Sequence, residues 1–262
     1  MTAVAEAQLF GGVYRGRRVF VTGHTGFKGS WLAYWLVQLG ASVTGFALEP
    51  PTDPSLFEEL HLAEHIDHRI GDVRDLKLLR SVILAAQPEI VFHLAAQPLV
   101  RLSYDQPVET FETNVMGSVN VLEAARGAKS VRAIVNVTSD KCYDNREWEF
   151  AYRENDALGG FDPYSASKGA AEIVTHAYRR SFFDDPSGPA VATGRAGRTT
   201  SSTTSAVNAS APTTPSANRA TIQRRVDRLT AWALQSSGAR LERAAEVPRI
   251  EFGFADVLRL TF

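Results

Sequence analysis

The sequence predicts an α/β protein built around a doubly wound parallel sheet. Apolar, mostly β-branched runs of strand length recur between residues 17 and 196, and helix-like stretches separate them. Nearly continuous apolar runs are typical of parallel strands, because helices cover both faces of such a sheet. Regular alternation of strand and helix favours right-handed crossovers, and therefore a Rossmann-like fold.

The predicted elements follow one another in a regular order. We expect strands at residues 17–23, 42–48, 68–72, 89–96, 131–139 and 190–196. Between them we expect helices at residues 29–39, 75–86, 107–126 and 164–183. In the first helix, Trp31, Leu32 and Trp35 are interpreted as core residues rather than as a binding platform.

The chain divides into four parts. Its 262 residues suffice for one large domain, or for one domain and a small partner. We assign residues 15–197 to the α/β domain and residues 1–14 to an N-terminal extension. Residues 198–218 contain no acidic or aromatic side chain and are mostly Ser, Thr and Ala, so we interpret them as a low-complexity linker. Residues 219–262 carry eight arginines and no lysine, and we treat them as a poorly ordered tail of unknown structure.

The composition limits the classes of partner. A formal net charge of −1 gives no indication of a nucleic-acid or anionic membrane partner. The first residues lack the pattern of a secretory signal, and no apolar stretch approaches the length of about 18 residues needed to span a membrane. A single cysteine, Cys142, excludes an internal disulfide. We therefore expect a cytoplasmic protein.

Three glycines follow the first predicted strand. Gly23, Gly26 and Gly29 stand three residues apart, at the start of a helix. Residues without a Cβ allow a tight turn and let a pyrophosphate approach the backbone at the positive end of the helix. Glycines also serve close packing, so the spacing predicts a dinucleotide site only because of its place in a strand–helix–strand unit.

Two acidic residues follow the next two strands. Glu49 lies where a carboxylate would bind ribose hydroxyls, which favours NAD over NADP. The alternative is a solvated loop residue. Asp72 would lie near an adenine; alternatively, it caps the helix that begins near Asp75.

Two further segments carry chemistry. In "YSASK", Tyr164 and Lys168 stand four residues apart and share one helical face. A lysine cation beside a tyrosine favours the phenolate and lowers its pKa. In "TSDKCY", Ser139, Asp140 and Lys141 end a strand, at the edge where ligands of open α/β sheets bind. The alternatives are an ordinary amphipathic helix and a turn in which Asp140 pairs with Lys141.

A histidine cluster is the remaining candidate site. His61, His65 and His68 stand at helical spacing and could ligate a metal. No cysteine is near, and we expect no metal site.

These motifs together resemble the extended short-chain dehydrogenase/reductase superfamily of NAD-dependent epimerases and dehydratases, and within it the CDP-glucose 4,6-dehydratases. The segments that carry the resemblance lie within residues 15–197 and read "TGHTGFKGSWL", "PPTDPSLFE", "GDVRD", "HLAAQPLVR", "TNVMGSVNVLEA", "TSDKCY", "PYSASKGAAE" and "VATGRAG". The resemblance to this group rests on "TSDK", because related epimerases and dehydratases usually differ at Asp140 or Lys141.

The resemblance implies a cofactor and a set of contacts to it. NAD would lie against Gly23, Thr25, Gly26, Phe27, Gly29, Glu49, Asp72, Val73, Ala95, Ala96, Asn114, Tyr164 and Lys168. Asn114 would also help organise the active site, with Gln97 and Arg101 near the cofactor and substrate loops. No metal is implied, and a homodimer is common in the family.

The resemblance also implies a reaction, the dehydration of CDP-glucose to CDP-4-keto-6-deoxyglucose. Tyr164, with Lys168 and Ser139, would take the proton of the sugar 4-hydroxyl during C4 oxidation. Lys141 would then remove the C5 proton, and Asp140 would protonate the departing 6-hydroxyl. Reduction at C6 completes the cycle.

After "VATGRAG" the sequence departs from the family. Family members continue with a segment like Asn-Val-Ile-Gly-Gly-Gly-Asp-Trp and a small substrate domain, whereas this chain continues with "RTTSSTTS". We interpret the change as a shift of reading frame, which the other two frames of the coding DNA would reveal. We therefore expect an NAD site with little or no dehydratase activity; the alternatives are an NAD-binding remnant or an enzyme for another nucleotide sugar.

Overall fold

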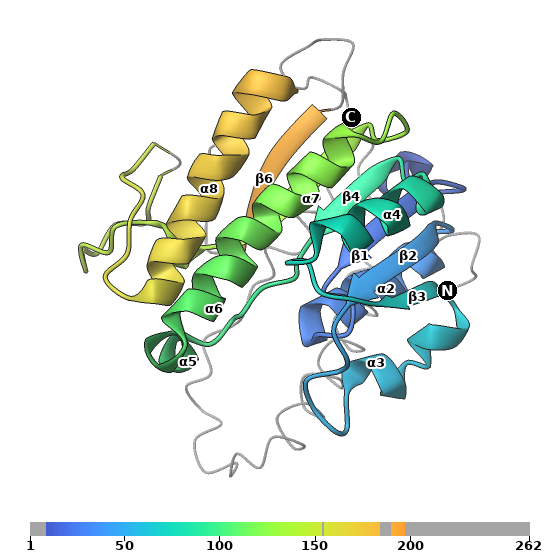
Figure 1. Cartoon of the computed structure of the whole chain (residues 1–262), viewed down its shortest axis with the longest axis horizontal. Coiled ribbons are helices and arrows are strands. Elements are labelled where there is room, and N and C mark those ends of the chain that lie inside the picture. Colours follow the sequence, from blue (N-terminus) through green and yellow to red (C-terminus); the bar gives the residue numbers. More distant parts are fainter. Residues whose placement is uncertain (1–8, 154, 184–189, 197–262) are drawn as a thin grey trace. The chain divides into compact units, whose positions relative to one another are not determined.

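A six-stranded parallel sheet organises the protein (Figure 1). The computed structural model describes residues 9–153, 155–183 and 190–196. The strands are β1 (Arg18–Thr22), β2 (Ser42–Ala47), β3 (Asp67–Ile70), β4 (Ile90–His93), β5 (Ala133–Ser139) and β6 (Ala190–Ala196). Their order is β3-β2-β1-β4-β5-β6, so the winding direction reverses between β1 and β4. Ligands of doubly wound sheets bind at the carboxyl ends of the strands beside this reversal.

Helices connect the strands. The α-helices are α2 (Phe27–Gln38), α3 (Leu56–Glu59), α4 (Leu76–Ala86), α5 (Val100–Asp105), α6 (Pro107–Phe111), α7 (Gly117–Arg126) and α8 (Pro163–Phe182). The short 3₁₀ turns are η1 (Leu9–Gly12), η2 (Leu62–Glu64) and η4 (Asp140–Cys142), and η3 (Glu112–Met116) is a π-helix. The alternation of strand and helix confirms the predicted fold class.

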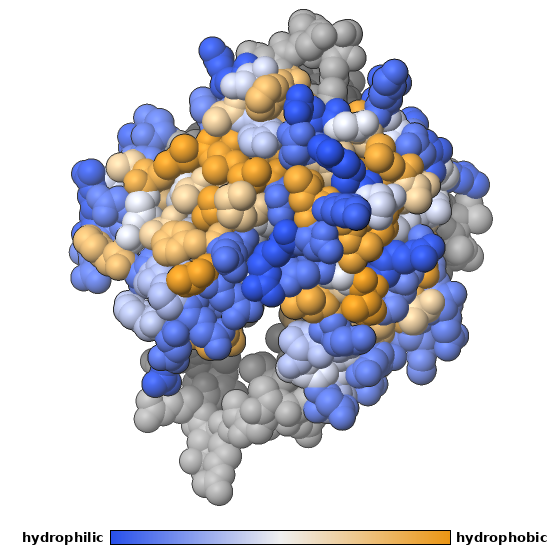
Figure 2. All heavy atoms as spheres, viewed as in Figure 1, coloured by the Kyte–Doolittle hydropathy of each residue, from blue (hydrophilic) through white to orange (hydrophobic). Residues whose placement is uncertain are grey.

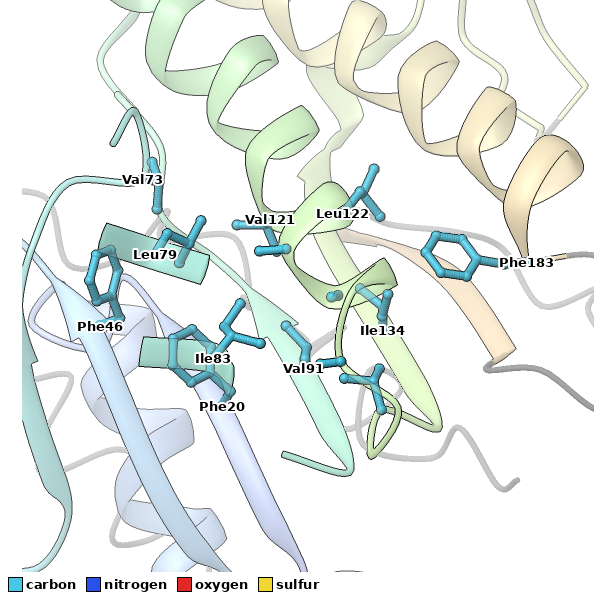
Figure 3. Packing of buried hydrophobic residues seen from close by; sticks show 14 residues of the cluster. Phe20, Phe46, Val73, Leu79, Ile83, Val91, Val121, Leu122, Ile134 and Phe183 are labelled. Atoms are coloured by element: carbon cyan, nitrogen blue, oxygen red, sulfur yellow. The ribbon is translucent and has the colours of Figure 1, made fainter. Parts of the chain in front are cut away.

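Alternating strand residues build two separate hydrophobic cores. Val19 and Val21 of β1 pack with α2, in a cluster that Val43, Ile90 and Phe92 extend across the sheet. Phe20, between those two valines, packs on the opposite face with α4 and α7. Figure 3 shows Phe20, Phe46, Val91 and Ile134 of the strands against Leu79, Ile83, Val121 and Leu122 of these helices. Period-two alternation in the strands thus covers both faces of the sheet with helices.

The N-terminal residues that precede β1 contribute to the first core. The side chain of Tyr14 is buried in this cluster, and Phe10 packs edge-on against Trp35 of α2. Burial raises the pKa of Tyr14 to about 12. Residues 9–14 of the predicted N-terminal extension therefore pack against the α/β domain.

The strands and long helices lie within a few residues of their predicted bounds. The predicted helix at 107–126 differs most, because the π-helix η3 separates α6 from α7. The helix α5 was not predicted. Asp75, rather than Asp72, caps α4, by accepting a hydrogen bond from the Leu78 amide at 3.0 Å, so the alternative role for Asp72 as a helix cap is wrong. The predicted linker and tail, 198–262, lie outside the described residues.

Candidate functional site

The turn after β1 is built by close backbone contacts. Gly23 has a φ of 75°, and a Cβ there would lie 2.7 Å from the amide nitrogen of Ala95. The Gly23 amide donates a hydrogen bond to the Phe46 carbonyl at 3.0 Å. This turn therefore packs directly against the ends of both neighbouring strands, a geometry that requires glycine.

The other two glycines differ in what surrounds them. A Cβ at Gly29 would lie 2.0 Å from the Gly23 carbonyl oxygen, so glycine is needed there to seat α2 on the turn. Among the residues that the structure describes, a Cβ at Gly26 would meet only that same oxygen, at an ordinary 3.5 Å. Gly26 is the N-terminal cap residue of α2, and no side chain of the described residues caps this end of the helix. Packing within the chain thus explains Gly29 but leaves the space above Gly26 for a ligand.

Side chains at the ends of β2 and β3 border the same turn. Thr25 is buried and donates a hydrogen bond to the Leu48 carbonyl at 2.9 Å. Glu49 is exposed, and its charge acts on His68 of β3. Asp72 is bound by Arg74, with 2.6 Å between Nη2 and Oδ2. Partial burial raises the pKa of Asp72, but the hydrogen bonds from Arg74 outweigh that effect and leave it below its usual value.

Val73 and Phe27, both predicted to contact NAD, differ in how deeply their side chains are buried. The side chain of Val73 belongs to the core under α7, where a Cβ on Gly117 would lie 2.8 Å from it, and its carbonyl accepts a hydrogen bond from Asn120 at 2.9 Å. Phe27, in contrast, is half exposed at the start of α2.

A histidine pair, with His24 buried and His68 partly buried, lies behind the glycine turn. Nε2 of His24 and Nδ1 of His68 are 2.6 Å apart, with the Phe57 ring against both imidazoles. A Cβ on Gly45 would lie 2.5 Å from the His24 ring, which explains the glycine in β2. Burial lowers the pKa of His24 to about 3, and the charge on His68 adds to this effect.

The histidines that were weighed as metal ligands do not converge. His68 faces His24 across the sheet, whereas His61 and His65 flank η2. Within residues 9–153, 155–183 and 190–196, no three His, Cys, Asp or Glu side chains are placed to hold a metal ion together.

The catalytic candidates meet at the carboxyl end of β5. Ser139 ends that strand, and its side chain hydrogen-bonds with Tyr164 in the first turn of α8. The Nζ atom of Lys168 lies 5.8 Å from the centroid of the Tyr164 ring. The Tyr164 amide donates to the Ser103 hydroxyl at 3.2 Å, which fixes the start of α8 against α5.

Burial dominates the acid–base properties of this pair. It raises the pKa of Tyr164, and the hydrogen bond with Ser139 opposes the rise. The net direction is the reverse of the lowering expected from the lysine neighbour alone. Burial also lowers the pKa of Lys168 to about 8, and the charge on Lys28 at the start of α2 adds to this effect.

Asp140 and Lys141 form the outer rim of the site. Both belong to the 3₁₀ turn η4 and are exposed. The Ser139 hydroxyl accepts a hydrogen bond from the Lys141 amide at 3.2 Å, which closes this turn. The two side chains thus project from the edge that also carries Tyr164.

Asn114 connects three segments of the site from inside the π-helix. Its Oδ1 accepts from the Gln97 amide at 2.8 Å, and its Nδ2 donates to the Ser167 hydroxyl at 2.8 Å and the Gln97 carbonyl at 3.1 Å. Asn114 therefore holds the backbone of Gln97 in place, whereas Arg101 is exposed on α5. π-Helical turns often occur at functional sites.

Several polar residues of this region were not predicted. Thr22, His93 and Ser118 form a buried hydrogen-bonded chain between the glycine turn and α7. Thr138 of β5 donates a short hydrogen bond to the buried Glu172 of α8. The detectable signal was the presence of polar residues in otherwise apolar strands, but the sequence does not say which partners they meet.

Nucleotide-sugar dehydratases and epimerases are the known proteins to which this chain is similar. The sequence model described as GDP-mannose 4,6 dehydratase matches residues 20–186. The chain is 60% identical over 171 residues to CDP-glucose 4,6-dehydratase from Salmonella typhimurium, covering 65% of this chain and 48% of that protein. It is 34% identical to UDP-glucose 4-epimerase from Mycolicibacterium smegmatis, over 63% of this chain and 52% of that protein. The chain thus spans about half the length of the curated relatives it matches.

Solved structures share the fold. A dTDP-glucose 4,6-dehydratase double mutant from Streptomyces venezuelae, solved with NAD bound, has a TM-score of 0.60 and 25% identity, over 68% of this chain and 55% of that one. UDP-glucose 4-epimerase from Brucella ovis has a TM-score of 0.58 and 22% identity, over 69% of this chain and 51% of that one. Because the family's sequence model covers more than half of the residues, the chain belongs to the family described as GDP-mannose 4,6 dehydratase.

Proposed function

We propose that this site serves the NAD-dependent dehydration of a nucleotide hexose, with CDP-glucose as substrate. One observation carries the proposal: the Ser139 side chain hydrogen-bonds with Tyr164, and the Nζ atom of Lys168 lies 5.8 Å from the centroid of the Tyr164 ring. A phenol, a hydroxyl and a cation at that edge suit proton removal from a sugar alcohol. The CDP-glucose assignment is supported by the 60% identity to the Salmonella enzyme.

The residues at the turn fit a dinucleotide. The space above Gly26 and the uncapped start of α2 suit a pyrophosphate, since a Cβ at Gly26 would point into open space apart from one contact at 3.5 Å. Thr25, Phe27 and Gly29 would flank it, and Ala95 and Ala96 would line the side formed by the end of β4. Glu49 would bind the ribose hydroxyls, with Asp72 and the Val73 backbone near the adenine. The exposed Glu49 carboxylate favours NAD, because a 2′-phosphate would be repelled there.

The chain's own groups would manage three proton movements. Tyr164, held by Ser139, would take the proton from the sugar 4-hydroxyl, and Lys168 would stabilise the resulting phenolate. Bound NAD would supply the hydride chemistry, from C4 to C6. Lys141 would move the C5 proton, which a ketone at C4 acidifies, by removing it and returning it to C5 once C6 is reduced. Asp140 would donate a proton to the leaving 6-hydroxyl, so that water departs.

A second candidate function follows from the composition after Gly197. The match covers only 48% of the length of the Salmonella relative, and residues 198–218 are mostly Ser, Thr and Ala. The second candidate is therefore an NAD-binding protein with little or no dehydratase activity. A third candidate is dehydration or epimerisation of another nucleotide sugar, favoured by the 34% identity to an epimerase.

One experiment separates these candidates. The purified 262-residue chain is titrated with NAD and then incubated with CDP-, UDP-, dTDP- and GDP-hexoses, and 4-keto products are detected. NAD binding with conversion of CDP-glucose supports the first proposal. NAD binding without any conversion supports the second candidate and rejects the first, and conversion of another sugar alone supports the third. A chain that does not bind NAD contradicts all three.

We also propose that the protein forms a homodimer through α6, η3 and α8. Val108, Met116 and Ile173, one from each of these elements, are exposed apolar side chains. Figure 2 shows apolar side chains gathered over the face that carries α7 and α8. Apolar patches of this kind mark interaction surfaces.

A further inference from the structure

His93 lies in a chain of buried hydrogen bonds at the end of β4. Its Nδ1 is 2.7 Å from the Thr22 hydroxyl, and its Nε2 is 3.2 Å from the Ser118 hydroxyl. All three side chains are almost fully buried. Thr22 directly precedes the glycine turn, and Ser118 lies in the first turn of α7.

The Thr22 hydroxyl fixes the role of Nδ1. Its oxygen accepts two hydrogen bonds, from the amides of Leu94 and Ala95, at 3.1 Å each. A hydroxyl oxygen has two acceptor lone pairs and one proton to donate. With both lone pairs used, Thr22 must donate its proton to His93, so Nδ1 carries no hydrogen.

The Ser118 hydroxyl independently fixes the role of Nε2. It donates to the carbonyl of Asn114, one turn earlier, at 2.7 Å. Since its only proton is used in that bond, Ser118 must accept from His93. Nε2 therefore carries the hydrogen. The hydrogen bonds at both nitrogens of His93 thus require the same neutral tautomer.

We infer that His93 is a positioning residue of the site, locked as the Nε2–H tautomer, which ties the glycine turn to the catalytic helix. The inference deepens the proposed function and rests on it for the identity of the ligand. At one end, Thr22 holds the Ala95 amide beside Gly23. At the other, Ser118 holds Asn114, which binds the Ser167 hydroxyl on α8.

The charge state of His93 is part of this role. A second proton on the His93 ring would make Nδ1 a donor facing the Thr22 hydroxyl proton, and the hydrogen bond between the two groups would be lost. Burial lowers the pKa of His93 to about 3, and the charge on Lys168 of α8 adds to this effect. Thr22 and Ser118 are the uncharged groups that face its two nitrogens from β1 and α7. His93 therefore stays neutral throughout the range of about pH 5 to 8 in which a solvated histidine titrates.

The tautomer is measurable without any ligand. Long-range ¹⁵N–¹H correlation spectra of the full-length labelled chain distinguish the protonated from the unprotonated ring nitrogen. The His93 signals are assigned by their absence in His93→Asn or, if that variant does not fold, by contacts of the ring protons with Ser118. We expect protonated Nε2 and unprotonated Nδ1, unchanged between about pH 5 and 8. A protonated Nδ1, or titration in that range, would overturn the inference.

A matched pair of variants tests the positioning role. Thr22→Val removes the hydroxyl at nearly constant shape, whereas Thr22→Ser keeps it. We expect Thr22→Val to expose the Ala95 amide to faster hydrogen exchange and to weaken NAD affinity about tenfold, and Thr22→Ser to behave like the wild type. Ser118→Ala replaces Thr22→Val if the latter does not fold, with the same loss of NAD affinity expected.

The outcomes separate the two proposals. Wild-type exchange and NAD affinity in a folded Thr22→Val protein would overturn the positioning role of His93. Absence of NAD binding by the wild-type chain would overturn the proposed function instead. In that case the tautomer and the Ala95 exchange rate still decide whether His93 links the two segments.

Discussion

At the scale of single residues, Gly26 and Gly29 meet different requirements. Gly29 seats the helix α2 on the turn, because a Cβ there would overlap the Gly23 carbonyl at 2.0 Å. Gly26 is not required by packing, and its extended backbone, with a φ of −76°, is one that other residues also adopt. Its lack of a side chain matters only if something approaches from outside the chain.

We therefore predict opposite effects for two alanine variants. Gly26→Ala should fold with unchanged stability but lose NAD affinity by at least about tenfold, since its methyl group enters the space proposed for the pyrophosphate. Gly29→Ala should instead cost about 1–3 kcal/mol of unfolding free energy through overpacking. Thermal unfolding and NAD titration of both proteins check this. Unimpaired NAD binding by Gly26→Ala would contradict the assignment of the turn.

Lys168 provides a test of burial through pH. Burial lowers the pKa of its amine to about 8 in the folded protein, from an ordinary value of 10.5. Between these two values the unfolded chain binds the proton and the folded chain does not, so raising the pH stabilises the folded state. Below about pH 8 both forms are protonated, and the buried charge is destabilising.

We predict a pH-dependent difference between the wild type and Lys168→Met. From about pH 7 to about pH 10, the unfolding free energy of the wild type should rise by about 2–3 kcal/mol relative to that of the variant. Urea unfolding of both proteins without NAD measures this difference and removes the effect of other titrating groups. A constant difference across that range would mean that Lys168 is solvated.

At the scale of elements, the position of α8 relative to the sheet decides the site. Asn136 of β5 donates to Thr175 at 2.8 Å, and Thr138 donates to Glu172, so successive inward-facing residues of the strand bond to successive turns of the helix. Asn114 adds a third contact, to Ser167, from the π-helix. These bonds fix both the rotation and the axial position of the helix that carries Tyr164 and Lys168.

Removing one of these bonds should loosen that attachment. We predict that Thr138→Val costs about 1–3 kcal/mol, because the buried Glu172 carboxyl loses this donor, whereas Thr138→Ser stays close to the wild type. Urea unfolding measures the free energies. Equal stability of the Val and Ser variants would show that packing alone holds α8 against β5.

At the scale of the whole molecule, ligand binding and folding are linked. If NAD binds only the folded chain, a concentration of about 100 times its Kd stabilises that state by about 2.7 kcal/mol. We predict a corresponding rise in Tm of about 5–10 °C for the wild type. Gly26→Ala is the control and, with its affinity lowered at least about tenfold, should show at most about half of that rise at the same NAD concentration. Differential scanning calorimetry gives both values.

The exposed apolar side chains predict a self-association that one charge abolishes. Ile173 is 59% exposed on α8, so its replacement affects the surface rather than the core. We expect the wild type to sediment as a dimer and Ile173→Glu to sediment as a monomer of unchanged Tm. A monomeric wild type would contradict the proposed interface.

Across the described residues, no helix combines the length and the apolar character needed to cross a membrane.

The sequence by itself determined the fold class, the order of its elements and the place of the glycine turn. These follow from local pattern: strand-length apolar runs, helical spacing and residues without a Cβ. The sequence also predicted that Ser139, Tyr164 and Lys168 lie at one edge of the sheet, because parallel strands all end on the same side. It did not indicate the contacts of Asn114 in the π-helix, because its partners Gln97 and Ser167 lie 17 and 53 residues away along the chain.

Only the tertiary structure decided which polar groups pair and what burial does to their charges. His93 and Thr22 are 71 residues apart in the chain, and no local pattern predicts that a hydrogen bond joins them. The pKa of Tyr164 likewise depends on how much water the surrounding segments exclude, and that exclusion outweighs the neighbouring lysine on which a sequence argument relies. Patterns along a chain encode which elements form, whereas hydrogen bonding and desolvation depend on distances that exist only after those elements have packed.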